Sequence, residues 1–422
     1  MFSPLKFAAA LLSLVAGTVI SASFVCSMAR AEPHRPDPES GSANSVARLM
    51  AGLQPSYREH YAIARNPAWK EHSAAIQAMW DTLRTGRGAA ITAFSKKELP
   101  SSCPVGRTLL YPFSGPDFLN AWWLFPGCET IVMFGLEHVG KVPTLETLSE
   151  RELTQFMIDL RAASADMLDR NYFITSNMTR QLHTSQLRGV LPMIMTSMAL
   201  SGLEILSIAP LALEHIDPMH AAAAGENADA ATEERVVKRK SMRKPRGVTV
   251  EFRTPDSRTP RRLVYFSVDA SDGSMAMYPE FLAYIRGLGA TTTLVKSGSY
   301  LLHAREFKSL RSTLLSVSGF LVQDDTGFPY ATLLKHGWDV SLRGSYSTPI
   351  PPFQYAYQPA LNAAYEQQHP APLAFDFGYN YHDRKTGHAV MMIGRRPAAS
   401  VLASSADPNA ASKAAAAFTP KR

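Results

Sequence analysis

Two stretches of the chain share one order of elements, and this order constrains the fold more than any other feature. Residues 108–115 (TLLYPFSG) resemble residues 291–298 (TTTLVKSG), each with an apolar strand pattern that leads into Ser-Gly. A helical pattern and a second apolar strand pattern follow in each, and the second strand ends at an acid, Glu137 or Asp324. Such units favour neighbouring parallel strands. We therefore predict a mixed α/β fold with two related strand–helix–strand halves in one compact unit; chance similarity of two ordinary units is the alternative.

Composition divides the chain into folded segments, linkers and tails. With 46% hydrophobic and 19% charged residues, the 422-residue chain is globular and long enough for one large or two ordinary domains. Stretches rich in Pro, Ser, Gly or Ala without apolar periodicity indicate linkers and tails. The predicted order is a signal peptide (1–31), a linker (32–45), an N-terminal α/β half (46–217), a basic low-complexity insertion (218–247), a C-terminal α/β half (248–396) and a disordered tail (397–422).

Apolar periodicity predicts the individual elements. Strands are expected at 108–113, 130–136, 248–252, 262–268, 291–296, 320–323 and 338–346. Helices are expected within 46–87, with a break at Asn66-Pro67, and at 116–125, 148–171, 278–288, 304–316 and 359–368. A helix and a strand are expected within 189–213, and an antiparallel hairpin is expected to pair 373–381 with 388–393.

The first 31 residues have the three parts of a secretory signal peptide. Lys6 supplies the positive start, residues 7–25 are almost wholly apolar, and Ala29-Arg30-Ala31 offers a small-x-small cleavage site. We therefore expect a periplasmic protein that is exported and cleaved. Because residues 7–25 could nearly span a bilayer, an uncleaved inner-membrane anchor is the alternative.

The formal charge of +7 is concentrated in one segment. Residues 218–247 hold seven Lys and Arg against four Asp and Glu, which is typical of a solvated loop. The near-neutral remainder and the expected compartment exclude nucleic acid as a partner. The expected ligand is a small molecule, a glycan or an envelope protein, and the membrane is contacted only through the signal segment if that segment stays uncleaved.

The two Ser-Gly turns and the two strand-end acids predict a shared site. Open α/β sheets bind ligands at the carboxyl ends of their strands, and a helix that opens at Ser-Gly favours an anion. Alternatively, the serines cap helices and the acids accept hydrogen bonds from loop amides. The candidate ligand-binding residues are Ser114, Gly115, Asp117, Glu137, Lys296, Ser297, His303, Asp324 and Asp325.

The sequence contains no complete catalytic constellation. Ser114 lacks the first Gly of the G-x-S-x-G elbow, and His303 precedes the acid pair, so a serine hydrolase is disfavoured. Glu137, Asp324, Asp325 and His303 could chemically hold a hard cation, but no spacing supports zinc and we assign no metal site. The sequence identifies no catalytic residue and no cofactor.

Two classes of function remain open. The first is a non-catalytic protein that binds a ligand or partner in a cleft between its two halves. The second is an envelope hydrolase or transferase that uses Glu137, Asp324 and Asp325. An acid with a perturbed pKa would favour catalysis. Aromatic walls would favour binding, and the sequence offers five residues for them: Tyr111, Phe113, Trp122, Trp123 and Tyr300.

Cys103 and Cys128 are the only cysteines that remain after removal of the signal segment. Cys103 lies just before the strand at 108–113, and Cys128 lies just after the helix at 116–125. A helix that follows a strand runs back beside it, so its end returns near the strand's start. Because the expected compartment is oxidising, we predict a disulfide between the two cysteines.

Three runs resemble those of an uncharacterised family of exported bacterial envelope proteins. They are residues 110–117 (LYPFSGPD), 299–303 (SYLLH) and 323–329 (QDDTGFP). The similarity extends over roughly residues 45–395 without the basic insertion. No activity is known for the family, so the resemblance implies a single-unit architecture and an envelope location, and it assigns no catalytic residue.

Overall fold

The computed structural model describes residues 38–170, 187–213, 244–349, 353–379 and 389–397. All of them belong to one compact unit that spans Asp37–Arg422. The predictions for the signal peptide, for residues 218–243 of the insertion and for 398–422 of the tail lie outside the described residues. None of the helices in the described ranges combines the length and apolar character that a membrane span requires.

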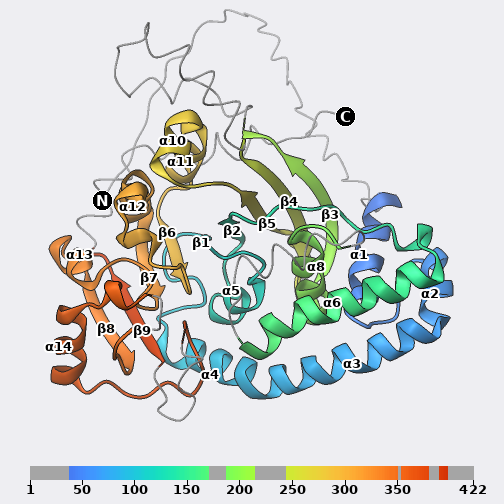
Figure 1. The fold of residues 1–422 in the computed structure, drawn as a ribbon, viewed down its shortest axis with the longest axis horizontal. Helices are drawn as coiled ribbons and strands as arrows, with labels where there is room; N and C mark the ends of the chain where they lie inside the picture. Colours follow the sequence, from blue (N-terminus) through green and yellow to red (C-terminus); the bar gives the residue numbers. More distant parts are fainter. Residues whose placement is uncertain (1–37, 171–186, 214–243, 350–352, 380–388, 398–422) are drawn as a thin grey trace, which may run out of the picture. The chain divides into compact units, whose positions relative to one another are not determined.

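The core is a nine-stranded mixed sheet, which confirms the predicted α/β class. Its order is β3-β4-β5-β2-β1-β6-β7-β9-β8 (Figure 1). The five central strands run parallel, and antiparallel strands extend both ends. The strands are β1 (Thr108–Pro112), β2 (Thr130–Gly135), β3 (Glu204–Leu211), β4 (Arg246–Arg253), β5 (Arg261–Ser267), β6 (Thr291–Val295), β7 (Ser318–Gln323), β8 (Asp339–Gly344) and β9 (Val390–Arg395).

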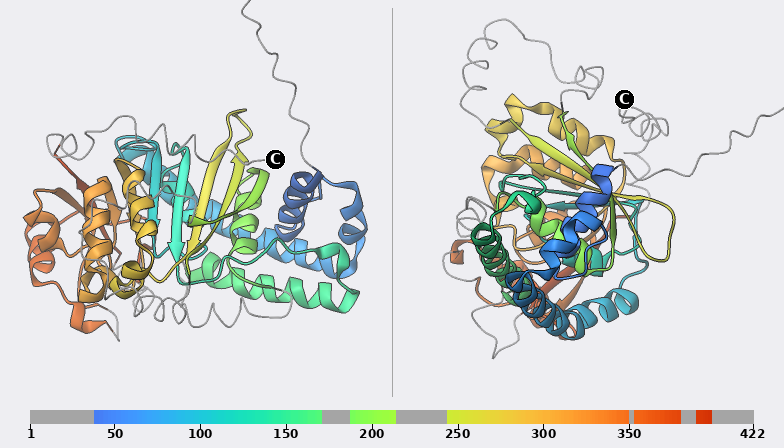
Figure 2. Two further views of the ribbon diagram at one scale, coloured as in Figure 1. Left: turned by 90° about the horizontal axis from the view of Figure 1, so that it is seen from above. Right: turned by 90° about the vertical axis from the view of Figure 1, so that its right-hand side faces the viewer.

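Helices cover both faces of the sheet (Figure 2). Alternate residues of β1 point to opposite faces, so Leu109 packs in one core and Leu110 in the other. The first face is covered by α1 (Pro38–Met50), α2 (Tyr61–Arg65), α3 (Pro67–Leu83), α4 (Ala89–Glu98), α5 (Phe118–Leu124), α6 (Glu150–Arg170) and α8 (Leu191–Leu200). The second face is covered by α10 (Asp272–Met277), α11 (Pro279–Gly287) and α12 (Lys308–Val317). At the β8 end, α13 (Tyr330–Lys335) packs against α14 (Pro359–Gln368).

The strand order reverses between β1 and β6. From β1 the chain passes through α5 to β2 on one side, and from β6 it passes through α12 to β7 on the other. The two segments that resemble each other in sequence therefore begin on adjacent parallel strands. β4 and β5, which follow the basic insertion, extend the β2 side, so the sheet divides at this reversal and not at the insertion. Such a reversal is the place where open α/β sheets bind ligands.

The predicted linker at 32–45 is wrong from residue 38 onward, because α1 occupies Pro38–Met50. Val46, Leu49 and Met50 are fully buried, and the helix packs against β3 and α8. The polar residues of its first turns gave no apolar period that could reveal it. By contrast, the predicted break at Asn66-Pro67 is confirmed, since Asn66 caps α3 by accepting from the Ala68 N–H at 2.8 Å.

The predicted C-terminal hairpin is also wrong in its pairing. Residues 373–379 form no strand, and β9 lies between β7 and β8 with an antiparallel neighbour on each side. Both edges of β9 are therefore occupied by strands that the hairpin pattern did not include. The sequence also missed α4, which continues from α3 through a π-helical turn at Arg84–Gly88.

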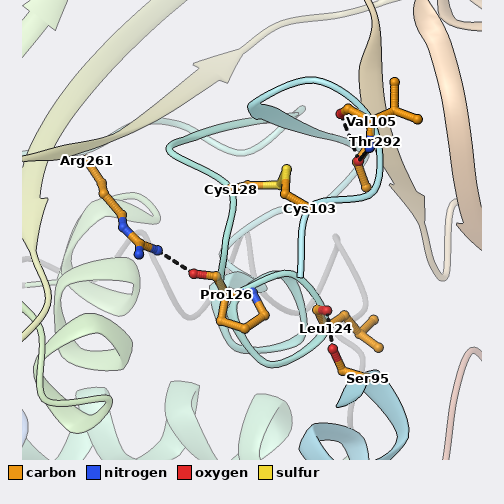
Figure 3. The surroundings of a disulfide bond; sticks show 8 residues. All are labelled: Ser95, Cys103, Val105, Leu124, Pro126, Cys128, Arg261 and Thr292. Atoms are coloured by element: carbon orange, nitrogen blue, oxygen red, sulfur yellow. Dashed lines mark hydrogen bonds between the residues drawn. A yellow bond between two sulfur atoms is a disulfide. The ribbon is translucent and has the colours of Figure 1, made fainter. Parts of the chain in front are cut away.

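The predicted disulfide is confirmed. Cys103 and Cys128 are bonded, with their Cα atoms 5.0 Å apart (Figure 3). Cys128 follows α5, and the Gly127 N–H donates to the Ser102 carbonyl at 3.1 Å beside the bond. As expected, the end of α5 returns to the start of β1.

Candidate functional site

Parallel strands place the predicted residues at one edge of the sheet. Ser114, Gly115 and Asp117 follow β1, Glu137 follows β2, Lys296 and Ser297 follow β6, and Asp324 and Asp325 follow β7. Backbone bonds join the ends of neighbouring strands, with Ser114 donating to Phe134 at 3.0 Å and Asp324 donating to Val295 at 3.1 Å. The sequence-based interpretation thus found the correct edge, but the contacts divide the residues into groups with different roles.

The prediction that each Ser-Gly turn opens a helix is wrong. The α5 helix begins at Phe118 and is capped by Asp117, whereas the Ser114 hydroxyl bonds the neighbouring Gly115 carbonyl. The α12 helix begins only at Lys308, well beyond Ser297. Neither serine is a helix cap, and neither turn provides the anion site expected from a helix start.

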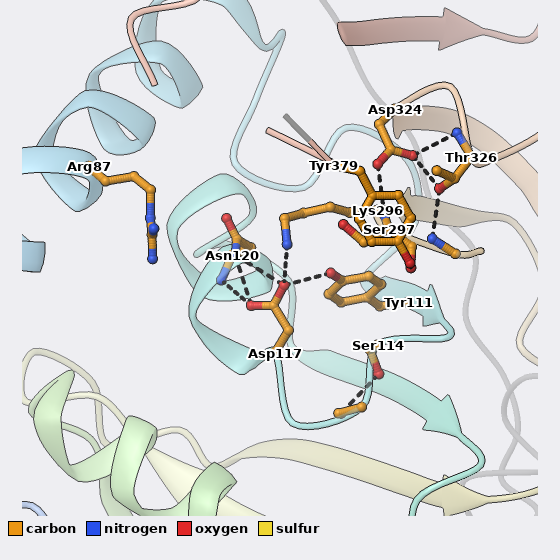
Figure 4. Close-up of polar contacts among 12 residues, drawn as sticks. Arg87, Tyr111, Ser114, Asp117, Asn120, Lys296, Ser297, Asp324, Thr326 and Tyr379 are labelled. Carbon is orange, nitrogen blue, oxygen red and sulfur yellow. Dashed lines mark hydrogen bonds and ion pairs between the residues drawn. The ribbon is translucent and has the colours of Figure 1, made fainter. Parts of the chain in front are cut away.

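Asp117 and Lys296 form a buried ion pair across the reversal point. The Lys296 ammonium donates to Asp117 at 3.0 Å, and the Tyr111 hydroxyl donates to the same oxygen at 2.8 Å (Figure 4). Asn120 adds a side-chain bond at 2.9 Å. Burial raises the pKa of Asp117, but Lys296 and these hydrogen bonds outweigh it, so the net pKa is lowered. Asp117 is therefore a charged anchor between the β1 and β6 sides.

Asp324 holds the turn after β6. Its carboxylate accepts the Ser297 N–H at 2.8 Å, the Thr326 N–H at 3.0 Å and the Thr326 hydroxyl at 2.5 Å. Thr326 in turn accepts the Gly298 N–H at 2.7 Å. Although burial raises the pKa of Asp324, its oxygens are engaged by loop amides. This is the structural role that the sequence gave as the alternative.

Glu137 lies apart from this turn, on the β2 side. Its carboxylate is beside the buried Tyr265, and the pKa of Tyr265 is raised by burial and by this acid. A Cβ on Gly135 would lie 2.5 Å from Glu137 Oε2, so the Glu137 carboxylate packs directly against the end of β2. Three strand spacings, roughly 14 Å, separate the ends of β2 and β7. The structure therefore does not bring Glu137 into contact with the Asp324–Asp325 pair.

Asp325 has different surroundings from the other acids. It is 7% exposed, and its carboxylate accepts the Tyr300 hydroxyl at 2.5 Å. Burial, followed by the charge of Asp324, raises the pKa of Asp325 to about 7. Burial and the charge of Asp325 raise the pKa of Tyr346 as well. No basic side chain in the described ranges pairs with Asp325, so its charge is uncompensated there.

The turn that carries Tyr300 has an unusual backbone. Ser297, Ser299 and Tyr300 have φ values of 53°, 51° and 55°, and Phe113 in the matching turn after β1 has 58°. Left-handed conformations cost about 1–2 kcal/mol per non-glycine residue. Strain of this kind is concentrated at functional sites when the surrounding structure enforces it.

Two polar atoms of this turn are buried and unpaired in the part of the chain that the structure describes. They are the Ser297 hydroxyl oxygen and His303 Nε2. Burial lowers the pKa of His303 to about 4, so the imidazole is neutral at pH 7. Its ring meets that of Tyr300 edge-on, with the centroids 5.2 Å apart.

Aromatic residues gather around Tyr300, the side-chain partner of the Asp325 carboxylate, but most are not the predicted ones. Phe353 lies 5.2 Å from Tyr300, 5.8 Å from Tyr379 and 6.3 Å from Tyr355, measured between ring centroids. The Tyr379 hydroxyl also donates to the Ser297 carbonyl at 2.8 Å. Of the five predicted wall residues, only Tyr300 belongs to this group. We use the name Asp325 site for Asp325 together with Tyr300, Phe353, Tyr355 and Tyr379.

The other four predicted wall residues lie elsewhere. Tyr111 and Trp123 are buried in the core of the first face, Phe113 packs on the second core, and Trp122 stacks on Phe118. The sequence signal that could have found the observed group is the FQYAY run at 353–357, whose Tyr355 is 77% exposed.

The described residues contain no group of three or more His, Cys, Asp or Glu arranged to hold a metal ion. Comparison with known proteins finds no matching family model, no similar curated protein and no similar solved structure.

Proposed function

We propose that this chain is an exported periplasmic protein that binds a small ligand, without catalysis, at the Asp325 site. The observation that carries the proposal is the pairing of an uncompensated buried acid with an aromatic group at the edge where α/β sheets bind ligands. Asp117 and Asp324 are each held by several donors that fix turns. The Asp325 carboxylate has only the Tyr300 hydroxyl as a side-chain partner among the described residues, so a purely structural role explains this carboxylate poorly.

Two features support export. The N-terminal 31 residues have the composition of a signal peptide, and the Cys103–Cys128 bond is of a kind that persists in oxidising compartments. Mass spectrometry of the protein from a bacterial periplasmic extract tests this directly. A mature N-terminus at or near Glu32 is expected, and full-length protein in the membrane fraction would show an uncleaved anchor instead.

A thermal-shift screen tests ligand binding. Small amines, amino acids, sugars and organic acids are added to the mature protein, to Asp325→Asn and to the matched control Asp339→Asn, whose acid is exposed on β8. A binder at 100 times its Kd stabilises the fold by about 2.7 kcal/mol. Compounds that stabilise the native protein and the control but not Asp325→Asn are expected. Equal shifts in all three proteins would place the binding elsewhere.

One observation favours a second candidate, an envelope hydrolase or transferase. With its pKa raised to about 7 by burial and by Asp324, Asp325 is suited to give and take a proton near neutral pH. In this case Asp325 is the general acid, while Asp324 and Glu137 keep the contacts described above. Incubation of any compound found by the screen separates the two candidates, because an enzyme consumes it with Asp325-dependent turnover whereas a binding protein returns it unchanged.

A further inference from the structure

We infer that the ligand of the Asp325 site carries an alkylated ammonium group, which lies against the rings of Phe353 and its neighbours and pairs with the Asp325 carboxylate. This inference rests on the proposed ligand-binding function and adds the chemical class of the ligand. It is carried by two observations of different kinds, the charge balance around Asp325 and the arrangement of the aromatic rings.

The charge balance calls for a cation. The groups that face Asp325 are the Asp324 carboxylate after β7, the Tyr300 hydroxyl in the turn after β6, and Tyr346 and Tyr365 from the β8 end. His303, which contacts Tyr300 and the Asp325 backbone, is neutral at pH 7 because burial lowers its pKa to about 4. None of them is positive. Lys296 lies near Asp324 but donates to Asp117 at 3.0 Å. Within the described ranges, the positive charge that would compensate an ionised Asp325 is therefore lacking, and a bound cation would supply it.

The rings point to the same class of ligand. The face of an aromatic ring is electron-rich and attracts a cation within about 6 Å of its centre, and groups of rings recognise quaternary ammonium ions. Phe353 and Tyr379 are nearly parallel, with an interplanar angle of 15°, and Phe353 also contacts Tyr300, the hydrogen-bond donor to Asp325. Rings and carboxylate are thus linked through one residue.

Choline is a suitable probe, and its neutral isostere 3,3-dimethyl-1-butanol is the matched control ligand. Isothermal titration of the mature protein at pH 8 is expected to show binding of choline and at least tenfold weaker binding of the alcohol. Because the cation prefers ionised Asp325, affinity should fall about tenfold per pH unit below pH 7, and binding at pH 6.5 should release a proton.

Variants locate the interaction. Asp325→Asn is expected to weaken choline binding at least tenfold, and Phe353→Leu is expected to weaken it about threefold to tenfold. Tyr61→Leu removes an exposed tyrosine on α2 and should leave the affinity unchanged. Circular dichroism of each variant establishes that it is folded, so that a loss of affinity reports the site.

Three results would overturn the inference: equal binding of choline and the alcohol, no heat of binding with folded protein at 50 mM choline, or unchanged affinity in folded Asp325→Asn. If neutral compounds from the thermal-shift screen still require Asp325, the proposed binding function stands and only the cationic ligand class fails. If no compound of any class depends on Asp325, the proposed function fails as well.

Discussion

Four acids at one sheet edge have different roles because their neighbours differ. Asp117 is paired with Lys296, Asp324 accepts loop amides, and Glu137 lies beside Tyr265. Asp325 is buried next to Asp324 and has no cation among the described residues to stabilise its charge. An acid that opposes the stability of the fold at neutral pH is better explained by function than by folding.

The pKa of Asp325 predicts how stability varies with pH. Burial raises this pKa from 3.8 to about 7, so between these values the folded chain holds a proton that the unfolded chain has lost. Asp325 therefore contributes stability at low pH that is lost as pH rises toward 7, on the order of 4 kcal/mol at most. Asp325→Asn should lose this dependence and be more stable than the native protein at pH 8.

The measurement is urea unfolding of both proteins at intervals from pH 4 to pH 8. His72 and His303, whose pKa values burial lowers to about 4, act in the opposite direction, so the quantity of interest is the difference between native protein and variant. Asp339→Asn is the control, because its acid is exposed. A difference that stays constant across this range would show that Asp325 is ionised throughout.

The buried Asp117–Lys296 pair gives a second prediction at this scale. In Lys296→Met the carboxylate is left buried without its cation, and breaking such a pair costs about 3–5 kcal/mol. The double variant Lys296→Met, Asp117→Asn should recover part of the loss, because no charge remains. Denaturant unfolding measures both, and equal stability of the two variants would contradict an energetic coupling between the partners.

Individual elements show how far local pattern determines structure. The strands β1, β2 and β6 and the helix α6 lie where the sequence places them. The three strands are short runs that are buried on both faces, and α6 has an apolar period of its own. Residues 38–45 of α1 were missed because contacts with β3 and α8 stabilise this helix, and these elements follow far along the chain. The pairing of β9 was mispredicted because its partners are set by the sheet and not by the nearest strand pattern.

The disulfide stabilises the unit formed by β1 and α5. It closes a loop with a sequence separation of 25, for which the chain-entropy model gives about 3 kcal/mol. Replacing both cysteines by serine should therefore lower the free energy of unfolding by about that amount. Addition of reductant should lower the free energy of unfolding of the native protein to that of the variant. A native protein that is indifferent to reductant would indicate that the bond does not form.

The end of α14 offers a stabilising change. His369 caps this helix with φ 44° and ψ 57°, and its side chain is exposed. Glycine adopts this left-handed conformation without the steric cost that other residues meet. His369→Gly should raise the free energy of unfolding by about 1 kcal/mol, whereas His336→Gly on α13's exposed end should not raise it. A destabilised His369→Gly would show that the histidine side chain has contacts that matter.

At the scale of the whole molecule, the strand reversal between β1 and β6 gives the site its position. The sequence predicted the correct edge, since acids that follow parallel strands must gather there. It could not predict that Phe353 and Tyr379 would join Tyr300, because these contacts connect segments far apart in the chain. It also could not separate Asp325 from Asp324, since the two differ only in the donors that the fold brings to them.

The proposed site depends on Asp325 being a buried acid whose proton titrates near neutral pH, because no cation in the described part of the chain compensates its charge. Difference infrared spectroscopy between the native protein and Asp325→Asn tests it most directly, since the carbonyl stretch of a protonated carboxyl group reports this one residue. The structure predicts a band that is present at pH 5 and disappears with a midpoint near pH 7. A midpoint near pH 4, the range of an ordinary aspartate, would contradict the account.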